Sequence, residues 1–247
     1  MWRGGSNRFA SVQNRPYSLF MADQAYDASG HRERLRKRLF EGGPDALLDH
    51  ELVEYLLALT IPRIDTKPTA KKLIRDFGGF GALLSADAET IMRIGEVSDR
   101  AAAAIKIAQA SALRLLQSEV KERPVLGSWQ ALLDYLHADM AHNPVERVRV
   151  LFLNSKNMLI RDEPMWEGSV DEAAVHVREI IRRALDYNAT AIILVHNHPS
   201  GDPSPSKQDI KLTRDIVEAG RHLKIEVHDH LIIGTRGHSS LRAMGLI

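Results

Sequence analysis

An α/β domain preceded by a small all-α domain is the fold that the sequence predicts. Between residues 31 and 121, apolar side chains recur with the three- and four-residue spacing of amphipathic helices, and glycine-containing turns separate these segments. From Glu146 onward, alternating and β-branched apolar runs predict strands, with helical stretches between them. A proline and a glycine mark residues 122–128 as the linker, and we place the second domain at residues 125–247.

The composition is that of an ordinary soluble globular protein, and we expect a cytoplasmic location. Of the 247 residues, 44% are hydrophobic and 26% are charged, and the formal net charge is +1. This charge gives no overall field that would attract nucleic acid or a membrane. The absence of cysteine excludes disulfides and thiolate metal sites. No apolar run is long enough to span a bilayer, and the N-terminus lacks the apolar core of a secretory signal.

The first thirty residues are polar and show no periodic pattern. We expect residues 1–30 to be disordered, because they offer little apolar surface to bury. Met21 is a second candidate start of the chain, which would make the residues before it an extension.

The helical domain, residues 31–121, has the organisation of helix-hairpin-helix DNA-binding proteins, in which N–H groups at tight turns contact a phosphate. We interpret the basic stretch Arg32–Arg38 as a solvated helix face rather than a phosphate-binding arm. Asp49 and Asp87 are the expected caps of the first and third helices. The spacing of apolar residues predicts helices over residues 49–59, 66–76, 86–94 and 99–121, with a glycine-rich turn at 78–81.

The second domain alternates between strand and helix patterns. The predicted elements, in order, are a helix over 129–139, a strand from Glu146, a hairpin turn at 154–157, a strand ending near Trp166, a helix over 175–187, a buried strand over 191–195, a helix over 206–219, and short closing strands at 223–227, 231–233 and 239–242.

The candidate chemistry follows the buried strand at residues 191–195. His196 and His198 are two residues apart, so in extended backbone their side chains can aim at one point. A Pro- and Gly-rich loop follows, and Ser206 is the expected N-cap of the next helix, which puts Asp209 in its first turn. Each feature alone has a structural explanation, such as exposed histidines or a helix cap. Together they favour a metal site, because histidine and carboxylate are ligands of catalytic zinc.

The pattern His-x-His-Pro, six residues, Ser, two residues, Asp resembles the JAMM motif of the JAB/MPN metalloenzymes. The stretches 195–209 and 229–234 resemble the RadC group of that family in particular, as does Asp49-His50-Glu51-Leu52 in the helical domain. The resemblance covers nearly all of residues 31–247. It implies a JAB/MPN-like mixed sheet flanked by helices, and a zinc ion held by His196, His198 and Asp209. It also implies that Ser206 helps to bind the oxyanion.

The resemblance implies in addition a catalytic glutamate on the first strand of the second domain. We assign this role to Glu146, at the start of that strand. Glu163, on the second strand, is the alternative, and we interpret it as an exposed strand residue. His228, Asp229 and His230 also suggest metal ligands, but we interpret them as residues near the site that either orient the ligands or are structural, since carboxylates and histidines often orient metal ligands.

The function implied is zinc-dependent hydrolysis of an amide or isopeptide bond in a peptide or protein substrate. The alternative is a DNA-binding accessory protein in repair or recombination, with DNA bound through residues 31–121 and a secondary metal site. Asn197 replaces the Ser or Thr of deubiquitinating members, which weakens any transfer of isopeptide specificity. Glu96-Val97-Ser98 replaces a Gly-x-Gly hairpin of relatives, and a glutamate there would repel a phosphate. The turn at 78–81 is another candidate phosphate contact.

Overall fold

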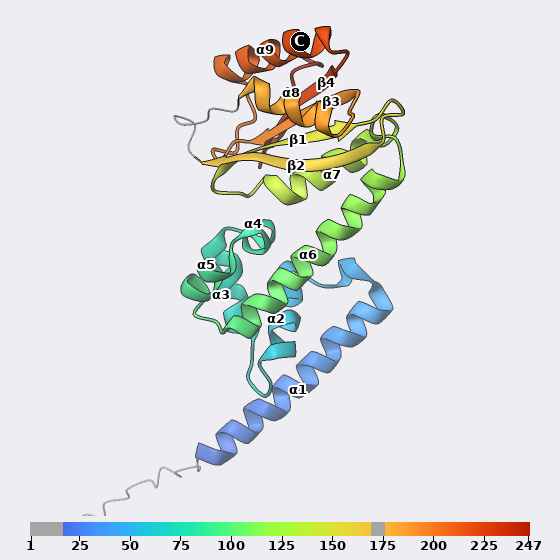
Figure 1. Cartoon of the computed structure of the whole chain (residues 1–247). Coiled ribbons are helices and arrows are strands. Elements are labelled where there is room, and N and C mark those ends of the chain that lie inside the picture. The colour runs from blue at the N-terminus through green and yellow to red at the C-terminus, as the bar shows by residue number, and fades with distance from the viewer. Residues whose placement is uncertain (1–16, 169–175) are drawn as a thin grey trace, which may run out of the picture. The chain divides into compact units, whose positions relative to one another are not determined.

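The computed structural model describes residues 17–168 and 176–247 (Figure 1). The chain divides into two compact units after Ile74, inside helix α3 (Lys67–Phe77). The first unit contains α1 (Tyr17–Gly42), the short 3-10 helix η1 (Pro44–Ala46), α2 (Asp49–Thr60) and the start of α3. The domain boundary that the sequence suggests at residues 122–128 stays a prediction.

The second unit contains the end of α3, helices before and between the strands, and the sheet itself. The helices before the sheet are α4 (Phe80–Ser85), α5 (Ala88–Gly95), α6 (Asp99–Glu122), the 3-10 helix η2 (Val125–Ser128) and α7 (Trp129–Met140). The strands are β1 (Glu146–Leu153), β2 (Leu159–Gly168), β3 (Ala191–Asn197), β4 (Glu226–Gly234) and β5 (Gly237–Ser240), and the remaining helices are α8 (Val177–Asp186) and α9 (Lys207–His222). None of the described helices is both long and apolar enough to cross a membrane.

Helix α1 differs from the expectation of disorder over residues 1–30, because it begins at Tyr17. Residues 17–29 contain Leu, Met, Gln and three Ala but no Pro or Gly, so good helix formers offset the polar composition. Residues 1–16 lie outside the described part of the chain, and the later start at Met21 stays a prediction.

Of the two N-caps predicted in the helical segment, Asp87 and Asp49, only Asp87 is confirmed. Asp87 caps α5, and its Oδ1 accepts a hydrogen bond from the Thr90 N–H at 2.7 Å. The prediction for Asp49 is wrong, because this residue lies inside the first turn of α2. The carboxylate of Glu51 instead accepts a hydrogen bond from the Leu48 N–H, at 2.9 Å.

Glu96 and Ser98, where the resemblance implies glycines in relatives, both act as helix caps in the turn between α5 and α6. Glu96 adopts the left-handed conformation, with φ of 54°, that a C-terminal helix cap requires. Ser98 caps α6, because its Oγ accepts from the Ala101 N–H at 3.3 Å. Helix α4 was not predicted, since it is only six residues long and follows two glycines at positive φ.

The five strands form one mixed sheet in the order β2-β1-β3-β4-β5, as the resemblance implies. β1 is antiparallel to both β2 and β3, whereas β3 and β4 are parallel and are joined through α9. The prediction of separate strands at 223–227 and 231–233 is wrong, because β4 runs through the polar triplet between them. His228, Asp229 and His230 interrupt the apolar pattern of the sequence but not the strand.

Helices cover both faces of this sheet, α7 on one side and α8 with α9 on the other (Figure 1). Alternate side chains of each strand enter the two cores, because successive residues of a strand point to opposite faces. The α7 face buries Leu151, Leu153, Ile193 and Val195, and the α8–α9 face buries Val150, Phe152, Ile192 and Leu194.

A buried ion cluster ties α7 to the sheet. Arg149 on β1 pairs with Asp139 of α7 and places its Nε 2.9 Å from Oδ1 of Asp162 on β2. The Tyr135 hydroxyl donates to Asp162 at 2.8 Å. Burial raises the pKa of Tyr135 well above its ordinary value and also raises the pKa of Asp162. Removing the arginine would leave two carboxylates without their counter-charge.

We therefore expect Arg149→Ala to lower the free energy of unfolding by about 3–5 kcal/mol, the usual cost of breaking a buried ion pair. Denaturant unfolding followed by tryptophan fluorescence measures this loss. Arg147→Ala is the matched control, because Arg147 pairs with Glu167 on the same strands but at an exposed site. The control should cost less than about 1 kcal/mol. Equal effects of the two substitutions would contradict the assigned role of the cluster.

Candidate metal centre

Strand β3 carries the two histidines to the edge of the core. His196 is still inside the sheet and is only 2% exposed. The His198 N–H donates to the carbonyl of Ile233 on β4 at 2.9 Å, which continues the pairing of the two strands past the end of β3. The chain then turns sharply at Gly201, with φ of 81°, where a Cβ atom would lie 2.3 Å from Oγ1 of Thr235. The loop therefore returns close to the sheet before α9 begins.

The first turn of α9 holds Asp209 in place. Ser206 is the N-cap as predicted, and its Oγ accepts from the Asp209 N–H at 3.1 Å. In return Oδ2 of Asp209 accepts from the Ser206 N–H at 2.7 Å, which completes a capping box. The other carboxylate oxygen, Oδ1, lies 3.4 Å from Nε2 of His196.

His196, His198 and Asp209 converge on one point, as predicted. Nε2 of His196 lies 2.9 Å from Nε2 of His198, and Nε2 of His198 lies 3.8 Å from Oδ2 of Asp209. One ligand atom from each residue lies within 4.8 Å of the others, and no other cluster of this kind occurs among the described residues. Ligands about 2.0–2.1 Å from a tetrahedral zinc are about 3.3 Å apart. The three residues thus form a cluster that can hold a metal ion.

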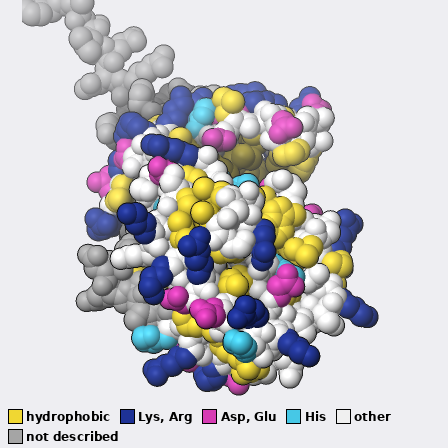
Figure 2. Space-filling model, turned by 90° about the horizontal axis from the view of Figure 1, so that it is seen from above, with side chains coloured by type: hydrophobic (Ala, Val, Ile, Leu, Met, Phe, Trp, Pro, Cys, Tyr) yellow, Lys and Arg dark blue, Asp and Glu magenta, His cyan; other side chains and the backbone are white. Residues whose placement is uncertain are grey.

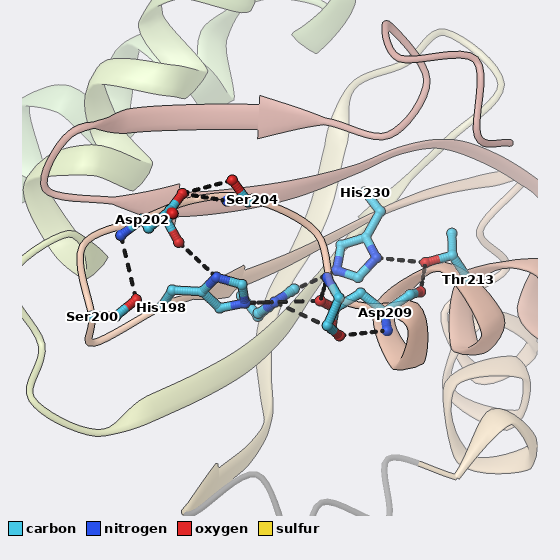
Figure 3. Close-up of polar contacts among 9 residues, drawn as sticks. His198, Ser200, Asp202, Ser204, Asp209, Thr213 and His230 are labelled. Carbon is cyan, nitrogen blue, oxygen red and sulfur yellow. Dashed lines mark hydrogen bonds and ion pairs between the residues drawn. The ribbon is translucent and has the colours of Figure 1, made fainter.

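The protonation of the histidines suits a cation. Nδ1 of His198 lies 2.8 Å from the main-chain carbonyl of Asp202, which can only accept, so this nitrogen carries the hydrogen (Figure 3). In its neutral form, with the hydrogen on Nδ1, His198 presents a bare Nε2 to the cluster. Burial lowers the pKa of His196 to about 4, although Asp209 opposes the shift. His196 is therefore neutral at pH 7, the form of imidazole that binds metals.

Glu146 lies beside this cluster. It shares a face of the sheet with Val148, which pairs with His196, and continuing that register places Glu146 opposite His198. The side chain is 9% exposed, and burial raises the pKa of its carboxyl, with smaller effects of His198 and Asp209 in opposite directions. The register thus places Glu146 on the face of the sheet that carries the two histidines.

Glu163, the alternative, is held elsewhere. The Tyr187 hydroxyl donates to its Oε2 at 2.5 Å, and Nη1 of Arg183 lies 3.1 Å from Oε1. Both partners belong to the helix α8 side of the sheet. The interpretation of Glu163 as an exposed strand residue is wrong, because its side chain is only 17% exposed.

Comparison with known proteins identifies the family. A family model described as a RadC-like JAB domain matches residues 126–246. A UPF0758 protein of Rhodobacter capsulatus is 48% identical over 213 residues, which cover 86% of this chain and all of that protein. The chain belongs to the RadC family. The mixed sheet and the His-His-Asp cluster described above lie within the region that the RadC model matches.

In this RadC-family chain, Asn197 connects the histidine pair to Glu146. Its Oδ1 accepts from the Arg147 N–H at 2.9 Å. Its Nδ2 donates to the carbonyls of Val145, at 3.1 Å, and Asn143, at 3.3 Å. The fully buried amide therefore holds the backbone on both sides of Glu146. The sequence analysis noted Asn197 only because the resemblance implies a Ser or Thr at this position in deubiquitinating members.

Two residues of the polar triplet on β4 have different roles: His230 contacts the cluster, and Asp229 contacts the C-terminal segment. His230 is in direct contact with His196, with 2.7 Å between Nε2 and Nδ1. Asp229 accepts hydrogen bonds from Ser240 and Arg242 and so anchors the C-terminal segment. Thr213, whose Oγ1 lies 2.6 Å from Nδ1 of His230, was not anticipated. Its only sequence signal is its position four residues after Asp209, one turn along α9.

Glu146→Gln should stabilise the metal-free RadC-family protein at pH 7. Because burial raises the pKa of Glu146, the unfolded chain loses this proton at lower pH than the folded chain does. As pH rises above the ordinary pKa of 4.5, ionisation of Glu146 therefore destabilises the folded protein. This destabilisation levels off above the raised pKa of the folded state. The gain from Glu146→Gln should be absent near pH 4 and present at pH 7.

Urea unfolding of metal-free protein between about pH 4 and pH 7 measures this gain. Glu163→Gln is the control, and it should destabilise at pH 7 because Glu163 has a cationic partner. A Glu146→Gln variant that is less stable than the wild type at pH 7 would contradict the assigned environment of Glu146.

Proposed function

We propose that this chain is a metal-dependent hydrolase that cleaves an amide or isopeptide bond, with zinc held by His196, His198 and Asp209. The convergence of three ligand atoms, with a buried carboxyl beside them, is the observation that carries the proposal. Two imidazole nitrogens and a carboxylate oxygen are a known ligand set of catalytic zinc, which leaves a fourth position for water. When bound in such a site, zinc lowers the pKa of water to roughly 7 and so supplies a nucleophile at neutral pH.

Glu146 is the general base in this proposal. Its carboxylate takes a proton from the attacking water and then delivers it to the leaving nitrogen. The raised pKa favours both steps, because a base works best when its pKa approaches the working pH. Asn197 keeps the backbone of this residue in place through bonds to Val145 and Arg147.

Ser206 is the oxyanion donor in this proposal. Its Oγ already accepts a hydrogen bond from the Asp209 N–H. A hydroxyl has a single hydrogen, which an accepting role leaves available to donate. Donation to the oxygen of the attacked carbonyl would stabilise the negative charge that develops there.

A peptide or protein is the proposed substrate, and DNA binding has less support. In the first unit, Arg32 donates to the carbonyls of Ile61 and Ile64, and Arg38 pairs with Glu51. Two cations of the basic stretch therefore hold helices together. Figure 2, seen from above the view of Figure 1, shows Lys and Arg side chains interspersed with acidic and apolar ones, so this one face forms no continuous basic surface. DNA binding through residues 31–121 remains the weaker alternative.

Purified protein loaded with zinc should contain about one zinc ion per chain, and His198→Ala should remove most of it. Glu146→Gln should keep the zinc but lower kcat/KM by about 10²–10⁴-fold, the usual contribution of a general base. Glu163→Gln is the matched control and should keep near-normal activity. The substrates are unmodified peptides, isopeptide-linked peptides and DNA, tested together with wild type and His198→Ala.

Full activity of Glu146→Gln would remove this residue from the mechanism. Activity that survives complete loss of zinc in His198→Ala would overturn the metal-dependent mechanism itself.

A further inference from the structure

We propose that His230 and Thr213 are positioning residues, which together fix the tautomer of His196 and link this histidine to the backbone of Asp209. The inference rests on the proposed function only in that the cluster holds a metal ion. His230 reaches the cluster from β4 and Thr213 from α9, and both are buried, at 2% and 0% exposure. Neither residue belongs to the motif that predicts the ligands.

The contacts form a continuous chain from one ligand to another (Figure 3). Nδ1 of His196 lies 2.7 Å from Nε2 of His230, and Nδ1 of His230 lies 2.6 Å from Oγ1 of Thr213. The Thr213 hydroxyl then donates to the main-chain carbonyl of Asp209 at 2.5 Å. A return contact, 3.4 Å between Oδ1 of Asp209 and Nε2 of His196, closes the ring.

The number of hydrogens that each group carries determines which group donates in every hydrogen bond of this series. A carbonyl carries no hydrogen, so Thr213 donates its only hydrogen to Asp209 and accepts from His230. Nδ1 of His230 therefore carries a hydrogen, which leaves Nε2 of this neutral, buried imidazole as an acceptor. His196 must donate to it from Nδ1. Neutral His196 is then left with a bare Nε2, the atom that faces the other two ligands.

The bare nitrogen of His196 faces the bare nitrogen of His198 at 2.9 Å. The tautomer of His198 is set independently, through the carbonyl of Asp202. Two lone pairs at this distance repel each other unless a cation lies between them. The hydrogen-bond chain thus holds His196 in the one tautomer that suits a metal ligand, and it does so through two residues outside the motif.

The alternative is that His230 and Thr213 only fill space in the core. Thr213→Val separates the two roles, because valine keeps the shape of threonine and removes only the hydroxyl. Without that hydroxyl, Nδ1–H of His230 has no acceptor. The directions of the hydrogen bonds that link Thr213, His230 and His196 are then no longer determined. A packing role predicts no change in zinc affinity in this variant, whereas the positioning role predicts a clear loss.

The test is the zinc dissociation constant of the full-length protein, measured by competition with a chromophoric chelator. Thr213→Val and His230→Leu should weaken zinc binding by about 10–100-fold, the usual effect of losing a partner of a ligand. Thr213→Ser keeps the hydroxyl and should stay within about threefold of wild type. His230→Gln places an amide oxygen where it can accept from His196, and it should recover part of the affinity lost in His230→Leu.

His228→Leu is the matched control on the same strand. His228 contacts Asn157 and Glu226 rather than the cluster, so its loss should leave zinc affinity unchanged. Wild-type affinity in Thr213→Val would overturn the positioning role while leaving the metal site intact. This holds even where His230→Leu fails to fold, because Thr213→Val and Thr213→Ser form a complete pair. A wild-type protein that binds no zinc would overturn both this inference and the proposed function.

Discussion

The burial of His196 is the constraint on which the rest of the site depends. A histidine with 2% exposure cannot rely on water, so each of its ring nitrogens needs a partner from the protein or a ligand. Nδ1 finds His230, which requires β4 to lie beside β3 in parallel register. Nε2 faces His198 and Asp209, which requires the loop after β3 to return and α9 to start next to the sheet. The positions of β4, of the loop after β3 and of α9 therefore together supply the hydrogen-bonding partners of both ring nitrogens of His196.

Helix α9 meets part of this requirement through a residue with two roles. One oxygen of Asp209 closes the capping box with the Ser206 N–H, and the other faces His196. Because the capping bond fixes the carboxylate, the ligand oxygen has little rotational freedom left to lose when a metal binds. One turn later, Thr213 bonds the carbonyl of the same residue. The first two turns of α9 thus order the ligand through both its side chain and its backbone.

The sequence predicts this site better than it predicts the surrounding fold, for physical reasons. The His-x-His pair, Ser206 and Asp209 lie within fourteen residues and are placed by local rules of strand alternation and helix capping. The contacts of His230 and Thr213 depend on strand pairing and helix packing, which no local pattern encodes. The dependence on tertiary contacts also explains why β4 was predicted as two strands. Its buried polar residues have partners on other elements, but in the sequence they resemble a break between two strands. At Asp49 the local rule itself misled, because the helix begins one residue earlier than predicted: Leu48 is the N-cap, and its N–H donates to the carboxylate of Glu51.

Asn197 shows how one short motif can place residues on both faces of the sheet. Strand alternation aims His196 and His198 at the α8–α9 side and turns Asn197 to the α7 side. There its amide meets three backbone groups around Glu146, which is fifty-one positions earlier in the chain. A serine or threonine at this position has one hydrogen to donate and could not serve both carbonyls. Asn197 therefore has a structural role of its own, the support of the strand that carries Glu146.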